Sequence, residues 1–260
     1  MKNLSILLLT ILAVTLLTAC GNDGEPVNRQ TLSATTNYRA IEGSDMVFSQ
    51  SVSKVELDYT AMTIIISGEF KDANNKTRSY ITPEMKMTLS SNSVYTFNNT
   101  NSVANSNIEG LKGYIDWATG MIWFTFIADG SLNVYGSTQL LYAYATTTVT
   151  DPENGKTYEH KESGYLFAFD SKCEKCTMII YNFVNDINGS IHAYETKYEG
   201  LTVTPTITGY AITGDNLMSS FADYYTITDL VFTVDDQGHA INGSFECNGN
   251  EFEVTGPLFP

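Results

Sequence analysis

Three cysteines in the body of the chain, Cys173, Cys176 and Cys247, are the residues best suited to redox or metal chemistry. Cys173-Glu-Lys-Cys176 lies between two apolar runs, so we expect it in a hairpin turn, where residues three apart come close enough for a disulfide. A redox pair needs a thiolate stabilised at a helix N-terminus, which a hairpin does not supply. The sequence therefore predicts a structural disulfide between Cys173 and Cys176, and a buried core thiol at Cys247.

The remaining metal-ligating residue types show no pattern of a metal site. Structural zinc sites use four ligands at regular spacing, whereas His160, His192 and His239 are scattered around a single C-x-x-C pair. Acidic turns such as Asp151 and Asp235-Asp236 lack the alternating ligands of a calcium loop, and aspartate in a turn usually bonds its own backbone. We therefore predict no metal and no cofactor.

Catalytic motifs are also missing. The chain contains no G-x-S-x-G, no H-E-x-x-H, no phosphate-binding glycine loop and no dinucleotide fingerprint. A carboxylate pair of the glycosidase type is defined by spacing in the fold, so 29 acidic residues leave a carboxylate-based hydrolase as an open alternative. We expect a protein that is not an enzyme. A net charge of −15, with no cluster of Lys and Arg, also excludes nucleic acid as a partner.

The N-terminus has the layout of a secretory signal, with Lys2, an apolar stretch from Leu4 to Leu17 and small residues before Cys20. Leu17-Thr18-Ala19-Cys20 resembles the lipobox of bacterial lipoproteins, whose cysteine becomes the lipidated first residue. The resemblance implies that residues 1–19 are a signal peptide and that Cys20 carries palmitate-type acyl chains. The membrane is then a partner through this lipid.

Residues 20–45 are polar and without period, which predicts a flexible tether. Its acidic residues Asp23 and Glu25 resemble an export signal of Bacteroidetes lipoproteins to the outer face of the outer membrane, although a solvated linker fits them equally. We expect a protein that is lipid-anchored to the outer membrane, on either its periplasmic or its cell-surface face. Export would also place the chain in an oxidising compartment, where a disulfide between Cys173 and Cys176 can persist.

Residues 46–260 predict a single all-β domain. Leu201, Val203 and Pro205 alternate with threonines, as in a half-buried strand, and Pro205 places that strand at an edge or a bulge. Similar runs cover 52–59, 63–70, 121–127, 140–149, 165–169, 177–184, 227–234 and 241–247, with Gly, Asn and Asp turns between them. Many short strands predict an antiparallel barrel or a two-sheet sandwich with very little helix.

The run at 121–127 is apolar on both faces, with Trp123 on one side and Phe124 on the other. Such a strand needs cover on both sides, either as a central strand between packed layers or as the wall of a barrel whose aromatics line an apolar cavity. The segments around 113–135 and 164–194 also resemble each other, which indicates either an internal duplication or shared strand composition.

The chain from 164 to 256 resembles the C-terminal part of uncharacterised Bacteroidetes cell-envelope lipoproteins with a calycin-like, or lipocalin-like, domain. The residues that carry this resemblance are Gly164-Tyr-Leu-Phe-Ala-Phe, Met178-Ile-Ile-Tyr-Asn, Tyr198-Glu-Gly-Leu-Thr-Val, Thr208-Gly-Tyr-Ala-Ile, Tyr225-Thr-Ile-Thr-Asp-Leu, Gly243-Ser-Phe and Val254-Thr-Gly256. The resemblance favours a calycin-like barrel over a sandwich and implies no activity.

Two functions of different class fit this sequence. The excess of 16 Tyr, 13 Phe and 2 Trp favours a non-catalytic binding module for a small apolar or glycan ligand. The alternative is a structural or adhesive surface protein of an envelope or fimbria-like assembly, which the polar β surface and the edge strand expected at Pro205 would suit. Protein partners have no signature in the sequence.

Overall fold

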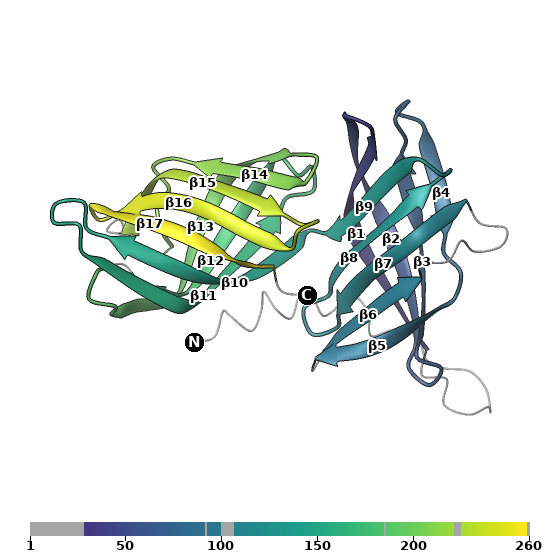
Figure 1. Cartoon of the computed structure of the whole chain (residues 1–260), viewed down its shortest axis with the longest axis horizontal. Helices are drawn as coiled ribbons and strands as arrows, with labels where there is room; N and C mark the ends of the chain where they lie inside the picture. Colours follow the sequence, from purple (N-terminus) through teal and green to yellow (C-terminus); the bar gives the residue numbers. More distant parts are fainter. Residues whose placement is uncertain (1–28, 92, 100–106, 185, 221–224, 259–260) are drawn as a thin grey trace.

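The computed structural model describes residues 29–91, 93–99, 107–184, 186–220 and 225–258. This part of the chain forms seventeen β-strands and no α-helix (Figure 1). The predicted all-β fold with very little helix is confirmed. No helix in the described part is long and apolar enough to cross a membrane.

The first nine strands form a sheet in the order β2-β1-β9-β8-β7-β6-β5-β3-β4. An additional pairing of β2 with β3 bends this sheet back on itself, so that it encloses its own apolar core. We call it the first sheet. Its strands are β1 (Arg29–Glu42), β2 (Asp45–Asp58), β3 (Thr63–Lys71), β4 (Thr77–Ile81), β5 (Met85–Ser91), β6 (Val94–Asn99), β7 (Ile108–Asp116), β8 (Met121–Ala128) and β9 (Leu132–Thr138).

The other eight strands follow one another around a closed antiparallel barrel, which is completed where β10 pairs with β17. Closure leaves the barrel without a free sheet edge. Its strands are β10 (Leu140–Thr150), β11 (Thr157–Phe169), β12 (Lys175–Val184), β13 (Ile191–Pro205), β14 (Gly209–Gly214), β15 (Ile227–Asp235), β16 (Ala240–Cys247) and β17 (Asn250–Pro257).

Gln139 alone separates β9 from β10, and therefore the first sheet from the barrel (Figure 1). Its backbone carbonyl accepts from the Phe169 amide, and its side chain donates to the Asp170 carbonyl. The outer face of the first sheet lies against one end of the barrel, and Phe48 of β2 packs against the barrel core. We call this contact region the junction.

Two predicted boundaries are corrected by these strands. Residues 29–42 form β1 rather than a flexible tether, and the single domain expected from 46 to 260 is two sheets, each with its own core. The polar composition of β1 concealed it, because its first five residues are exposed or half-buried while Tyr38 and Ala40 enter the core. The rest of the expected tether, residues 20–28, lies outside the described residues.

Of the two places expected for the strand at Pro205, an edge or a bulge, the edge is wrong, whereas β13 does shift register against β12 between Tyr198 and Leu201, as at a bulge. β13 pairs with β12 on one side and with β14 on the other. Pro205 is the last residue of β13, where the ladder ends at the turn of residues 206–208. A proline at that position interrupts no interior ladder, which is why a paired strand tolerates it.

The two similar segments form comparable three-strand meanders, β7-β8-β9 and β11-β12-β13. Their matching residues do not occupy equivalent places. Phe124 is buried in the core of the first sheet, whereas the matching Tyr181 is half-buried and lies outside the barrel core. The similarity in sequence is therefore one of strand pattern, and the duplication stays a prediction.

Candidate functional site

The barrel interior is filled by aromatic rings. Phe245 and Phe252 stack with centroids 4.6 Å apart, and Phe232 packs edge-on against Phe167 at 5.5 Å. The phenol of Tyr165 lies 2.8 Å from the Thr147 hydroxyl, so polar groups in the interior also find partners there. In the described part of the barrel, the aromatic side chains that suggested an apolar cavity fill the interior themselves.

Two open clefts lie on outer surfaces of the part of the chain that the structure describes. One, of about 440 Å³, lies on the barrel wall over β13, β14 and β15 and has no aromatic lining. The other, of about 320 Å³, lies at the junction, and we call it the junction cleft. It is lined by Gly110, Lys112, Trp123, Thr125, Phe126, Ile127, Asn133, Tyr135 and Gln237.

Strand alternation explains why these side chains meet. On β8, Ile122, Phe124 and Phe126 face the core of the first sheet, so Trp123 and Thr125 between them face outward. Asn133 and Tyr135 alternate in the same way on β9, which pairs with β8. The barrel contributes Gln237 from its β15–β16 turn. The two-sided apolar pattern of β8 is thus explained, since the barrel end covers its outer face.

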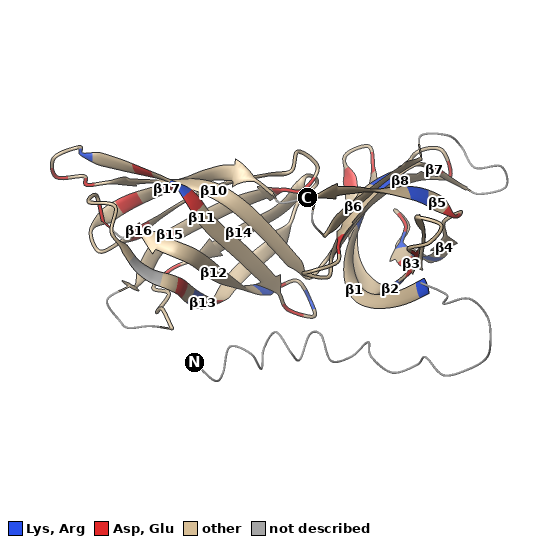
Figure 2. Ribbon diagram, turned by 90° about the horizontal axis from the view of Figure 1, so that it is seen from below, with Lys and Arg blue, Asp and Glu red and all other residues tan. Residues whose placement is uncertain are grey.

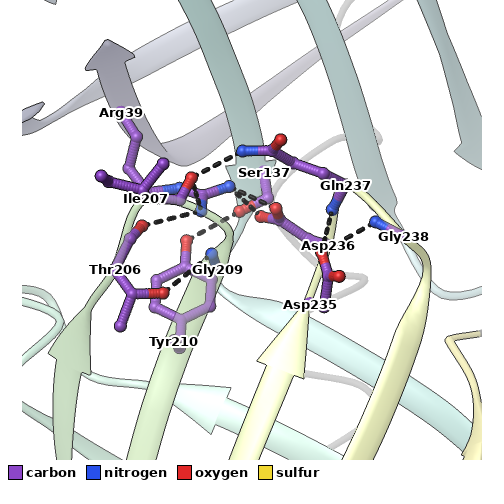
Figure 3. A network of polar contacts seen from close by, with 10 residues as sticks. All are labelled: Arg39, Ser137, Thr206, Ile207, Gly209, Tyr210, Asp235, Asp236, Gln237 and Gly238. Atoms are coloured by element: carbon purple, nitrogen blue, oxygen red, sulfur yellow. Dashed lines mark hydrogen bonds and ion pairs between the residues drawn. The ribbon is translucent and has the colours of Figure 1, made fainter. Parts of the chain in front are cut away.

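Arg39 is the centre of the polar contacts that hold the junction together (Figure 3). It lies on the outer face of β1 and is only 1% exposed. Its guanidinium forms a two-oxygen ion pair with Asp236 of the barrel, which is equally buried. It also donates to the carbonyls of Thr206 and Ile207, at 3.1 and 3.3 Å. The ion pair joins β1 to the turn between β15 and β16, 197 residues further along the chain.

Aromatic rings complete the surroundings of Arg39. Its guanidinium carbon lies 5.5 Å from the ring centroid of Tyr135 and 5.3 Å from that of Tyr210, so the cation contacts the faces of both rings. The Tyr210 hydroxyl lies 3.0 Å from that of Ser137. Burial raises the pKa of the Asp236 carboxyl, while the charge and hydrogen bonds of Arg39 act to lower it.

The ion-pair network extends into the junction cleft through Gln237. Its side-chain amide donates to the Ile207 carbonyl at 2.6 Å, and Arg39 donates to the same oxygen. Asp235 holds the backbone of this turn, because its carboxylate accepts from the amides of Gln237 and Gly238 (Figure 3). One amide side chain of the cleft is therefore held in place by buried contacts beneath it.

The floor of the junction cleft is Trp123, which is 5% exposed. Its ring stacks on Tyr114 at 6.0 Å and meets His239 edge-on at 4.5 Å. The indole N–H of Trp123 and Nδ1 of His239 are buried without a hydrogen-bond partner among the described residues. Burial, together with the charge of Lys112, lowers the pKa of His239, which favours the neutral imidazole.

Cys173, Cys176 and Cys247 are buried free thiols in the structure, so the disulfide expected across the turn is not formed in it. The turn does occur, between β11 and β12, but Cys173 has a positive φ of 54° and its sulfur accepts from the Asn37 side chain of β1 at 3.6 Å. The thiol is thereby directed toward the junction. Cys247 belongs to the barrel core, as predicted.

The acidic turns behave in two ways. Asp151 and Asp235 accept hydrogen bonds from backbone amides of their own turns, as expected of aspartate there. Asp236 instead forms the ion pair with Arg39. In the described part of the chain no three His, Cys, Asp or Glu side chains gather as metal ligands. Basic residues lie singly over both sheets (Figure 2).

Cys20 and the predicted lipidation site lie outside the described residues, and so does the signal peptide. The residues that build the junction, Arg39 and Asp236, were not predicted as functional. No short motif could have revealed them, because each lies on an ordinary strand or turn, and only the packing of the first sheet on the barrel joins them.

Comparison with known proteins adds little to this geometry. No family model and no curated protein matches the chain. Among solved structures, isotype 1 transferrin binding protein B of serogroup B Neisseria meningitidis is similar over 90% of this chain and 77% of its own. The identity is 8% and the TM-score is 0.27.

Proposed function

We propose that the chain is a non-catalytic binding module, anchored to the outer membrane through lipid on Cys20, which takes a small ligand in its junction cleft. The observation that carries this proposal is the lining of that cleft. It combines aromatic side chains, two side-chain amides, the hydroxyls of Thr125 and Tyr135 and one ammonium group, and its Gln237 amide is held by the buried Arg39 network. Small-molecule sites typically combine apolar walls with a few fixed polar groups in this way.

The filled barrel supports binding on the outside rather than inside. An enclosed ligand would have to displace the packed rings of Phe232, Phe245 and Phe252. The junction cleft, in contrast, lies open between two bodies that are already fixed to each other. A volume of about 320 Å³ is near the lower end of the range for small-molecule sites, so the ligand is small.

Tryptophan offers a direct test, because the chain has two, Trp117 and Trp123. Trp123 forms the cleft floor, while Trp117 packs on Tyr59 elsewhere in the first sheet. With fluorotryptophan in the full chain, we expect members of a mixed library of small polar molecules to shift the Trp123 resonance and leave Trp117 in place. A library that moves neither resonance, or only Trp117, contradicts the proposal.

The anchor is tested separately. Cys20 lipidation predicts that the chain fractionates with outer membranes and that its N-terminal peptide carries acyl chains by mass spectrometry. Cys20→Ser should release the protein or leave an uncleaved, unacylated form. Its matched control is Cys247→Ser, which changes a buried thiol and should not alter membrane attachment. An unmodified Cys20 thiol in the mature protein would refute the anchor.

The structural or adhesive alternative is favoured by one observation. β4 is the outermost strand of the first sheet, where β3 is its one partner among the described strands, and Ile81 on it is 67% exposed. An exposed strand edge is a template for pairing with another chain. Under this alternative the protein assembles as its concentration rises and Ile81→Lys prevents assembly. A strictly monomeric sedimentation profile excludes it.

A further inference from the structure

We propose that the ligand of the junction cleft is a carbohydrate, bound through one pyranose ring of a glycan. This assignment rests on the proposed binding function and names its ligand class. A pyranose has faces rich in C–H groups and a rim of hydroxyls that both donate and accept hydrogen bonds. The junction cleft presents the complement of both features.

The aromatic side chains of the junction cleft suit the C–H faces of a pyranose. Trp123 forms the floor but is only 5% exposed, because Tyr114 and His239 cover its ring. The accessible aromatic surface is that of Tyr135 on the neighbouring strand, which is half-buried with its ring against Arg39. Aromatic side chains offer large, rigid apolar surfaces with little conformational freedom to lose. Arg39 further restrains Tyr135, so this wall is in place before a ligand arrives and the entropic cost of binding is reduced.

The polar groups suit the hydroxyl rim. A side-chain amide carries two N–H donors and a carbonyl acceptor, so it can bond adjacent hydroxyls of a sugar in either direction. Gln237 is oriented by its bond to the Ile207 carbonyl, which leaves its own carbonyl oxygen available. The Asn133 amide forms no side-chain hydrogen bond to any residue that the structure describes, and Thr125 lies opposite Tyr135 on the paired strand β8.

Other ligand classes fit less well. Phosphate groups and nucleotides are held by several cations, but the lining has one, the exposed Lys112, because Asp236 engages Arg39. The net charge of −15 also repels polyanions. A purely apolar ligand would remove water from the amides of Asn133 and Gln237 without replacing its hydrogen bonds, which is unfavourable.

The test uses the full chain labelled with fluorotryptophan. The probes are galactose, galacturonic acid, N-acetylglucosamine and N-acetylneuraminic acid, against inorganic phosphate, adenosine monophosphate, decanoate and trialanine. We expect at least one sugar to shift the Trp123 resonance in a saturable way while Trp117 stays unmoved. The non-sugars should leave both resonances unchanged.

A matched pair of variants locates the binding. Asn133→Ala removes an amide of the cleft and should raise the dissociation constant of the responding sugar by about tenfold, as expected for the loss of one hydrogen bond. Asn242→Ala removes an exposed amide from β16 of the barrel and should leave it unchanged. Tyr135→Phe keeps the ring and should retain most of the affinity, whereas Tyr135→Ala should abolish it.

The contrary outcomes are distinct. If only a non-sugar shifts Trp123, the carbohydrate assignment is wrong while the binding function of the cleft stands. If no probe shifts Trp123, and the mixed library does not either, both are wrong. If a sugar shifts Trp123 but Asn133→Ala binds it as tightly as Asn242→Ala does, the sugar is not held in the junction cleft and the assignment fails.

Discussion

The buried thiols lead to a prediction about reactivity and pH. Burial, as the main cause, raises the pKa values of Cys173, Cys176 and Cys247 to about 12 from the ordinary 9.0. The native chain should therefore resist alkylation by iodoacetamide at about pH 8, and all three thiols should react once urea unfolds it. Mass spectrometry of the labelled peptides measures this.

The raised pKa values of the thiols also predict how the free energy of unfolding changes with pH. Above about pH 9 the unfolded thiols lose protons that the native thiols retain up to about pH 12, so the free energy of unfolding should fall as the pH rises between these values. Rapid labelling of Cys173 or Cys176 in the native state would contradict this burial. A pair that resists labelling even in urea would restore the disulfide predicted from sequence.

Individual residues also show what the sequence could reveal about the site. Trp123 was identified as one face of a strand that needed cover on both sides, and that prediction is confirmed. Arg39 and Asp236 could not be predicted as partners, because their proximity depends on how the first sheet packs on the barrel. Residue type and local spacing carry no record of such a contact.

At the level of the strands, alternation predicted most of the fold. The runs at 63–70, 121–127 and 227–234 correspond to β3, β8 and β15. β1 was missed because its exposed half reads as a polar linker. The division into two sheets was missed because alternation reports which face of a strand is buried, and not which strand lies beside it.

Gly209 provides a prediction at this level. It begins β14, directly below the turn whose carbonyls accept from Arg39, and a Cβ added there would lie 1.8 Å from the Val234 carbonyl oxygen. Gly209→Ala should therefore force the backbone apart and lower the free energy of unfolding by about 1–3 kcal/mol. Urea denaturation measures the change.

Gly214 at the other end of β14 is the matched control. A Cβ at Gly214 would lie 2.6 Å from the end of the Leu217 side chain, which can move, whereas the Val234 backbone cannot. Gly214→Ala should therefore cost less stability than Gly209→Ala. Equal losses in the two variants would show that the close backbone approach at Gly209 is not what restricts that position.

For the whole molecule, Arg39 tests whether the first sheet and the barrel act as one body. Arg39→Met leaves the Asp236 carboxylate buried without its partner, and breaking such a pair typically costs about 3–5 kcal/mol. Because the remaining carboxyl then has a raised pKa, the variant should be more stable at about pH 5 than at about pH 8. Urea unfolding at both pH values measures this.

The double variant Arg39→Met with Asp236→Leu supplies the control. It removes both charges, so most of the lost stability and the added pH dependence should disappear. If the double variant is no more stable than Arg39→Met alone, the unpaired carboxylate is not the cause of the loss. Lost ring contacts with Tyr135 and Tyr210 would then account for it.

The length of β1 bears on how the molecule would stand on a membrane. The chain enters this strand at Arg29, beside Asp58, and reaches Asn133 of the cleft only at Ile41. An extended strand of that span covers at most about 40 Å. If Cys20 is embedded in lipid, the junction cleft lies the length of β1 beyond the point where the described chain enters the first sheet.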